Sequence, residues 1–95
     1  MVTFVILANF TEQGIRNVKQ KVERGEAFRK GVEKVGGRVT EYWTFGNYDI
    51  VAILEAPDDE TAWQLVARLG SLANIRTTTL RAFTAEEIKR QIAKL

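Results

Sequence analysis

The sequence contains no cysteine and no histidine among its 95 residues. Without cysteine, the chain has no disulfide framework, thiol nucleophile, iron–sulfur ligation or thiolate zinc site. Without histidine, it has no Ser-His-Asp triad, no imidazole base and no histidine-ligated haem or zinc. We therefore predict no metal and no cofactor, and any chemistry must use carboxylates, phenols, amides or guanidinium groups.

Long apolar runs and runs of like charge are also missing. The longest apolar stretches have the length of strands and are too short for a transmembrane helix. The 14 Lys and Arg residues and the 12 Asp and Glu residues are interleaved, and the formal net charge is +2. No run of like charges is long enough to indicate a nucleic-acid or membrane arm. The strand-like segment 2–8 is not preceded by the basic start of a secretory leader. We therefore expect a cytoplasmic protein whose partners are neither nucleic acid nor membrane.

The sequence has a regular succession of strand and helix patterns. Apolar and β-branched runs predict strands, and apolar residues spaced by three or four predict helices. The order βαββαβ with an extra C-terminal helix is the ferredoxin-like pattern. We predict an α+β fold with a four-stranded antiparallel sheet, two helices on one face, and one domain over residues 1–95. The predicted strands are residues 2–10, 38–45, 49–56 and 74–83, and the predicted helices are residues 12–35, 57–70 and 84–95.

The first predicted helix has one apolar stripe, which should face the sheet. Gly14 and Asn17 are weak helix formers, so we expect an irregular or hinged first turn, and Gly36-Gly37 should end the helix. The stripe consists of Ile15, Val18, Val22, Gly25, Phe28, Val32 and Val35.

The later helices carry terminal signals. Thr84 and Glu87 fit a capping box at the start of the last helix, and Gly70 is expected to end the one before it. Three consecutive acidic residues, 58–60, suggest a metal site at first sight. Their position after Pro57 favours helix capping instead.

The two strands expected at the centre of the sheet are apolar on both faces. Alternation places Val5, Leu7, Val51 and Ile53 on the face opposite to the helices. Two helices cover only one face, and a contiguous exposed apolar patch is unusual on a monomer. We therefore predict a homo-oligomer, with a sheet-to-sheet dimer as its commonest form. The alternative is that the C-terminal helix folds back over this face.

The segment around the predicted hairpin resembles the signature of the GYD-domain family. That family is named for the Gly, Tyr and Asp that stand here as Gly46, Tyr48 and Asp49. Residues 9–15 resemble its opening motif, and Leu69-Gly70 together with residues 74–83 resembles its closing motif, so the resemblance covers nearly the whole chain. It implies a small bacterial or archaeal protein with a ferredoxin-like fold, related to the dimeric α/β-barrel proteins. It implies no particular reaction.

Tyr48 and Asp49 have two interpretations. In the functional one, a phenol and a carboxylate lie at the mouth of a cleft and take part in hydrogen bonding or acid–base chemistry. In the structural one, Gly46-Asn47 forms a turn, Asp49 accepts backbone N–H bonds across it, and Tyr48 packs. The position next to a turn favours the structural interpretation.

Asn9 and Glu55 are polar residues in otherwise apolar strands. Either they line a ligand pocket, where Glu55 could supply a base, or Glu55 reaches solvent at the end of its strand. A buried Glu55 needs a partner such as Arg76 or Arg81. These two arginines suggest recognition of a carboxylate or phosphate. The alternative is that they form ion pairs with Glu41 or Glu55 at a subunit interface.

Three aromatic residues lie outside the predicted apolar stripes. Tyr42 and Trp43 belong to the second predicted strand, and Trp63 belongs to the second predicted helix. Such residues are usual as core or interface anchors. A stacking platform for a ligand is the alternative.

Three hypotheses about function follow. The first is a small-molecule-binding homo-oligomer with an apolar pocket in or beside the dimer. The second is a cofactor-independent monooxygenase or isomerase of the dimeric α/β-barrel type. In it, Asp49 or Glu55 acts as base and Asn9 or Arg76 stabilises an anion. This hypothesis rests on analogy of fold alone. The third is a regulatory or assembly module. No catalytic residue is predicted, and the candidate ligand-binding residues are Asn9, Trp43, Tyr48, Asp49, Glu55, Arg76 and Arg81.

Overall fold

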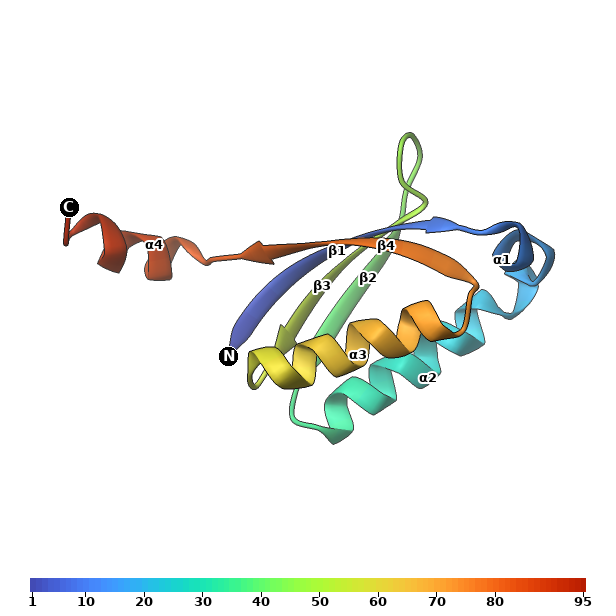
Figure 1. The fold of residues 1–95 in the computed structure, drawn as a ribbon, viewed down its shortest axis with the longest axis horizontal. Coiled ribbons are helices and arrows are strands. Elements are labelled where there is room, and N and C mark those ends of the chain that lie inside the picture. The colour runs from blue at the N-terminus through green and yellow to red at the C-terminus, as the bar shows by residue number, and fades with distance from the viewer.

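A computed structural model describes residues 1–95 and has a four-stranded antiparallel sheet with helices on one face (Figure 1). The strands are ordered β2-β3-β1-β4, and each neighbouring pair is antiparallel. The prediction of a ferredoxin-like α+β fold with an extra C-terminal helix is therefore confirmed. The elements in chain order are β1 (Val2–Phe10), α1 (Glu12–Arg16), η1 (Val18–Gln20), α2 (Lys21–Lys34), β2 (Arg38–Trp43), β3 (Ile50–Ala56), α3 (Asp59–Ser71), β4 (Ile75–Ala82) and α4 (Ala85–Ile92).

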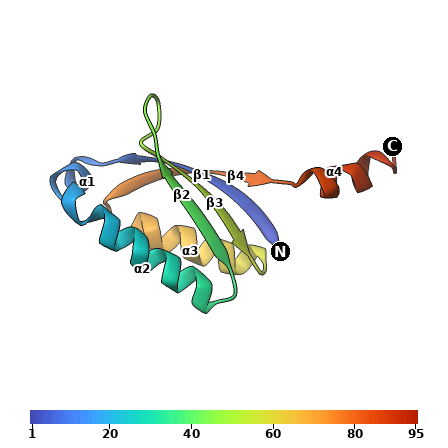
Figure 2. The same cartoon turned by 180° about the vertical axis from the view of Figure 1, so that it is seen from behind.

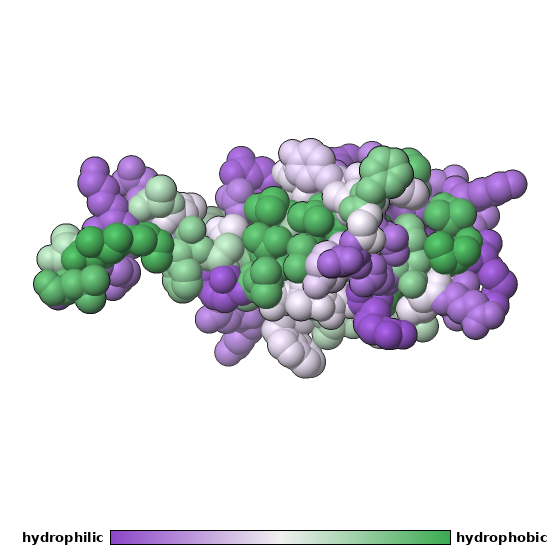
Figure 3. All heavy atoms as spheres, turned by 90° about the horizontal axis from the view of Figure 1, so that it is seen from above, coloured by the Kyte–Doolittle hydropathy of each residue, from purple (hydrophilic) through white to green (hydrophobic).

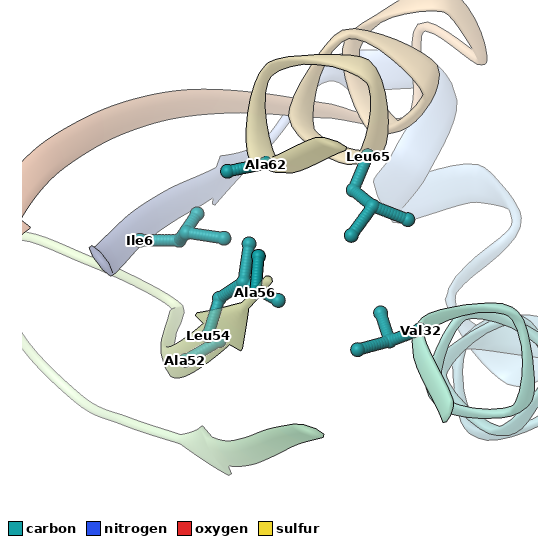
Figure 4. Close-up of a cluster of buried hydrophobic side chains, with 7 residues drawn as sticks. All are labelled: Ile6, Val32, Ala52, Leu54, Ala56, Ala62 and Leu65. Atoms are coloured by element: carbon teal, nitrogen blue, oxygen red, sulfur yellow. The ribbon is translucent and has the colours of Figure 1, made fainter. Parts of the chain in front are cut away.

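Alternation along β1 and β3 determines which side chains form the core. In the register of this pair, Ile6 lies opposite Ala52, and Val5 lies opposite Ile53. The first of these pairs faces the helices and is buried, whereas the second is half-buried on the other face. Figure 4 shows Val32 of α2 and Leu65 of α3 meeting the sheet residues of this core. The core is thin, because only 11 of 95 residues are buried.

The segment between β1 and α2 is irregular, as Gly14 and Asn17 predict. Asn17 terminates α1 with φ −103° and ψ 20°, and the 3₁₀ turn η1 separates it from α2. Gly14 is buried against the loop that precedes β4, and a Cβ atom there would lie 1.9 Å from the carbonyl oxygen of Asn74. Only glycine therefore permits the backbone at position 14 to come so close to this loop. A hydrogen bond from Thr11 N–H to the same carbonyl oxygen (3.1 Å) holds the two segments together.

The caps of the last two helices form as predicted. Asp58 accepts a bond from Thr61 N–H at 2.8 Å, and this backbone hydrogen bond lowers the pKa of its carboxyl. Thr84 and Glu87 make the reciprocal capping box of α4, and the Thr84 N–H lowers the pKa of the Glu87 carboxyl. One expectation is wrong: Gly70 lies inside the last turn of α3, which continues to Ser71. The chain turns two residues beyond, where Ala73 has φ 62°.

Helix α4 projects away from the body of the molecule and does not fold back over the sheet (Figures 1 and 2). Thr84 is extended, with φ −71° and ψ 161°, so the chain continues outward from β4 before the capping box starts the helix. The molecule measures 50 × 31 × 18 Å and has a radius of gyration of 14.4 Å, against about 12 Å for a compact chain of this length. Its accessible surface of 6695 Å² exceeds by about 1,200 Å² the roughly 5,500 Å² usual for this mass. The face of the sheet opposite to the helices therefore remains open.

Candidate functional site

The hairpin loop between β2 and β3 holds Asp49 in a structural position. Its carboxylate accepts a bond from Phe10 N–H at 2.9 Å, and its own N–H donates to the Ala8 carbonyl at 2.9 Å. The loop turns at Gly46, whose φ of 101° favours glycine, and Tyr48 contributes its carbonyl as acceptor for the Thr44 hydroxyl at 2.6 Å. Asp49 thus accepts a backbone N–H, but it binds the end of β1 instead of bridging its own turn.

Glu55 lies on the open face and is paired with a residue that was not among the expected partners. Both of its carboxylate oxygens accept from Arg38 Nη2 at 2.9 Å. The register places Arg38 directly opposite Glu55. Arg76 is on the open face opposite Asn9, at the other end of the sheet, so it does not reach this carboxylate.

Arg81 and Trp43 lie on the helix-covered face, at opposite edges of the sheet. The Arg81 guanidinium donates to the Thr3 carbonyl at 3.2 Å and lies 4.6 Å from the ring centroid of Phe83, at the base of the α4 arm. Trp43 makes an edge-to-face contact with Phe10, with ring centroids 5.8 Å apart.

The seven candidate residues do not converge on one pocket. The structure brings Asn9 and Arg76 together as register partners and joins Asp49 to the end of β1. Glu55, Trp43 and Arg81 each have separate surroundings. The aromatic residues Tyr42, Trp43 and Trp63 are all more than half exposed and lie outside the core.

The open face of the sheet carries a contiguous set of apolar side chains, here called the open-face patch. Figure 3 looks onto this face and shows apolar atoms over the middle of the sheet and along α4. Tyr42 and Leu80 are about half exposed, and the other members are half-buried by their neighbours alone. On α4, Ile88, Ile92 and the following Leu95 are also exposed. The open-face patch consists of Val5, Leu7, Tyr42, Val51, Ile53 and Leu80.

A second feature is a pocket of about 300 Å³ between the sheet and the two long helices, here called the helix–sheet pocket. Its floor is formed by β1 and β3, and its walls are formed by the first part of α2 and the second part of α3. The pocket exists because α2 presents Gly25 and Gly31 to it, and a Cβ atom at Gly31 would meet nothing within 4 Å. None of the seven candidate residues lines it.

Two basic side chains of α2 enter this pocket. Lys21 is 5% exposed and donates to Glu41 Oε1 at 2.7 Å, with its Nζ atom 5.9 Å from the ring centroid of Trp43. Arg24 donates through Nη1 to the Asn17 carbonyl at 3.0 Å, but its Nη2 is buried without any hydrogen-bond partner. The lysine is therefore neutralised within the chain, and the arginine is not.

The sequence pattern contains a signal for Lys21, although the predicted stripe omitted it. Lys21, Gly25, Phe28 and Val32 are spaced by four, three and four, which places them on one face of a helix that begins at Lys21. The predicted stripe used Val22 instead, and Val22 is 67% exposed. Gly25, Phe28 and Val32 of the predicted stripe do face the sheet, so within α2 the error is confined to its first turn.

No group of three or more acidic side chains is placed to hold a metal ion. No helix has both the length and the apolar character needed to cross a membrane.

Comparison with known proteins identifies a family, a relative whose name states its binding partners, and a similar solved structure. A family model described as GYD domain matches residues 4–92. A Thermus thermophilus protein named "Glutamine synthetase and cystathionine beta-lyase binding protein" is 29% identical over 90 residues, which cover 93% of this chain and 95% of the relative. The crystal structure of TTHA0845 from Thermus thermophilus superimposes with a TM-score of 0.58 and 26% identity, over 90% of this chain and 96% of that chain.

Proposed function

The chain belongs to the GYD domain family, and from that premise we propose that it is a protein-binding protein that acts as a homo-oligomer. The observation that carries the proposal is the open-face patch, which neither the helices nor the C-terminal arm of the same chain covers. Contiguous apolar surface of this kind is typical of protein–protein interfaces.

A second copy is the occupant that fits the open-face patch best. Two sheets that pack face to face bury apolar side chains between them. The open face also has polar residues near its ends, Asn9 and Arg76 at one and the Arg38–Glu55 pair at the other, as expected for an interface with an apolar centre and a polar rim. The excess surface of about 1,200 Å², which includes the surface of the projecting arm, is larger than the roughly 800 Å² that each partner buries in a standard interface.

Helix α4 adds to this surface. Its Ile88 and Ile92 are exposed, and apolar atoms of this arm are visible from the same side as the open-face patch (Figure 3). An apolar stripe that its own domain leaves uncovered is suited to packing on the neighbouring copy. In the proposed assembly, the arm of one copy therefore extends along the other.

The named relative supplies the class of partner. That protein is named for binding glutamine synthetase and cystathionine β-lyase, and we propose that this chain binds an enzyme of one of these two kinds. We also propose that this chain binds a small molecule in the helix–sheet pocket.

The oligomer is tested by sedimentation equilibrium on the full chain. We expect an oligomer at micromolar concentration and a monomer after Val51→Glu, which puts a charge at the centre of the open-face patch. Val22→Glu makes the same change on the exposed side of α2 and should leave the oligomer intact. A monomeric wild-type protein, or equal dissociation by both variants, would refute self-association through this face.

Enzyme binding is tested by biolayer interferometry with the glutamine synthetase and the cystathionine β-lyase of the organism that encodes the chain. Binding of either enzyme, saturable and absent with an unrelated enzyme, is expected. Failure of both enzymes to bind would refute the partner class while leaving the oligomer result unaffected.

A further inference from the structure

The helix–sheet pocket combines an apolar interior with one buried guanidinium nitrogen that has no partner, on Arg24; the other guanidinium at the pocket, on Arg68, is exposed to solvent. Of its 17 lining residues, 10 are hydrophobic, and Ile6, Ala8, Ile50 and Ala52 form its floor. A site of about 300 Å³ lies at the lower end of the range for small-molecule pockets. Such a pocket takes a ligand with an apolar body of modest size.

The charges in and around the pocket favour a monoanionic ligand. Glu41 balances Lys21 at 2.7 Å. Arg24 has no carboxylate partner, and its Nη2 is buried without an acceptor. Buried donors in folded proteins nearly always have a partner, and an unpaired donor on a charged group is especially unfavourable. The missing acceptor at this position is therefore best supplied by a ligand.

We propose that the helix–sheet pocket binds a small carboxylic acid with a branched or aromatic apolar body. Its carboxylate accepts from Arg24 Nη2, and its apolar body lies over the floor of the pocket towards Leu65 and Leu69. The assignment rests on the small-molecule part of the proposed function and is independent of protein binding. One ionised oxygen group matches the single buried guanidinium donor, because Arg68 at the rim is exposed to solvent, whereas a doubly charged phosphate would bring excess negative charge into an apolar site.

The close approach of α2 to β2 supports a site that is formed before the ligand arrives. A Cβ atom at Gly25 would lie 3.1 Å from Glu41 Oε1 and 3.2 Å from Lys21 Nζ, so the glycine leaves room for this ion pair beside the pocket. The pair neutralises Lys21 where it lines the pocket. Arg24 is thus the group that selects the anion.

The test is an NMR titration of the full chain with phenylacetate, with phenylacetamide and inorganic phosphate as matched probes. Saturable shifts at the methyl groups of Ala8, Ala52 and Leu69 are expected with phenylacetate, and much weaker ones with the other two. Arg24→Gln should weaken binding by about ten- to a hundredfold, as expected for loss of a charged hydrogen bond. Arg24→Lys should recover only part of the affinity, because the planar fork is lost.

Gly31→Leu should abolish binding by filling the pocket. Gly70→Leu is its control, because Gly70 is also an open helix position but does not line the pocket. Thermal unfolding establishes that both variants are folded. Equal shifts with the acid and the amide, an unchanged phenylacetate affinity in Arg24→Gln, or phenylacetate binding that survives Gly31→Leu would overturn the proposal.

Val51→Glu separates this inference from the oligomer. The pocket lies on the opposite side of the sheet from Val51, so phenylacetate affinity should be unchanged in that variant. Loss of affinity there would overturn the placement of the site within a single copy. Absence of phenylacetate binding with an intact oligomer would refute the pocket assignment alone.

Discussion

Replacing Glu41 by leucine tests the buried ion pair beside the helix–sheet pocket. The Lys21 side chain is 6% exposed and the Glu41 side chain 28% exposed, with Nζ and Oε1 2.7 Å apart. Removal of one member of a buried pair leaves an uncompensated charge, which costs about 3–5 kcal/mol. Because water reaches part of Glu41, we expect the free energy of unfolding to fall by about 3 kcal/mol, near the lower end of this range.

This loss is large for a chain of this size. A stability of about 5–14 kcal/mol is usual for 95 residues, and a loss of about 3 kcal/mol lowers the unfolding midpoint by about 12–24 °C. Urea unfolding followed by circular dichroism, at one fixed protein concentration, measures it directly. Fixed concentration matters because the proposed self-association would stabilise the folded state by mass action.

Two further variants serve as controls for the Glu41→Leu measurement. Glu26→Leu removes the exposed partner of Arg29 and should change stability little, because solvent screens such pairs. Lys21→Met combined with Glu41→Leu should recover most of the loss, since no charge then remains buried. If Glu41→Leu behaves like Glu26→Leu, or if the double variant is no better than the single one, the ion pair is not what stabilises this region.

Two other predictions concern the loop before β4 and the start of α3. Gly14→Ala should cost about 1–3 kcal/mol by overpacking, because its Cβ would lie 1.9 Å from the Asn74 carbonyl oxygen; urea unfolding of this variant indistinguishable from wild type would contradict the close approach. Folding lowers the Asp58 pKa below its ordinary 3.8, so its contribution to stability is present at neutral pH and lost as the pH falls through that value and below. Asp58→Asn keeps a capping side chain that does not titrate in this range, so it should flatten the acid side of the plot of urea midpoint against pH. An unchanged slope would show that the Asp58 cap does not contribute to the loss of stability in acid.

Features that depend on local sequence were predictable. Alternation in β1 and β3 identifies both the buried Ile6–Ala52 pair and the open-face residues, because side-chain direction in a strand has period two. The capping box at Thr84 likewise gives the start of α4. These signals lie within a few residues of the structure that they determine.

Features that depend on three-dimensional pairing were not predictable. Glu55 pairs with Arg38 because of the β2–β3 register, which the strand patterns alone leave open. That Arg24 lines a pocket depends on how α2 and α3 pack over the sheet, and its polar character kept it out of the predicted apolar stripe. A capping box also fixes where a helix begins without fixing its direction, so α4 was free in the sequence to cover the sheet or to leave it.

In the proposed assembly, the projecting arm makes the secondary structure of this chain sensitive to its concentration. Helix α4 has eight residues, and isolated helices shorter than about 12–15 residues are marginal in water even with good caps. Outside an assembly, the arm has only its capping box and its own turns to keep it helical. Dilution should therefore melt the last dozen residues while the sheet stays intact, and the arm would order again only where another surface buries its isoleucines.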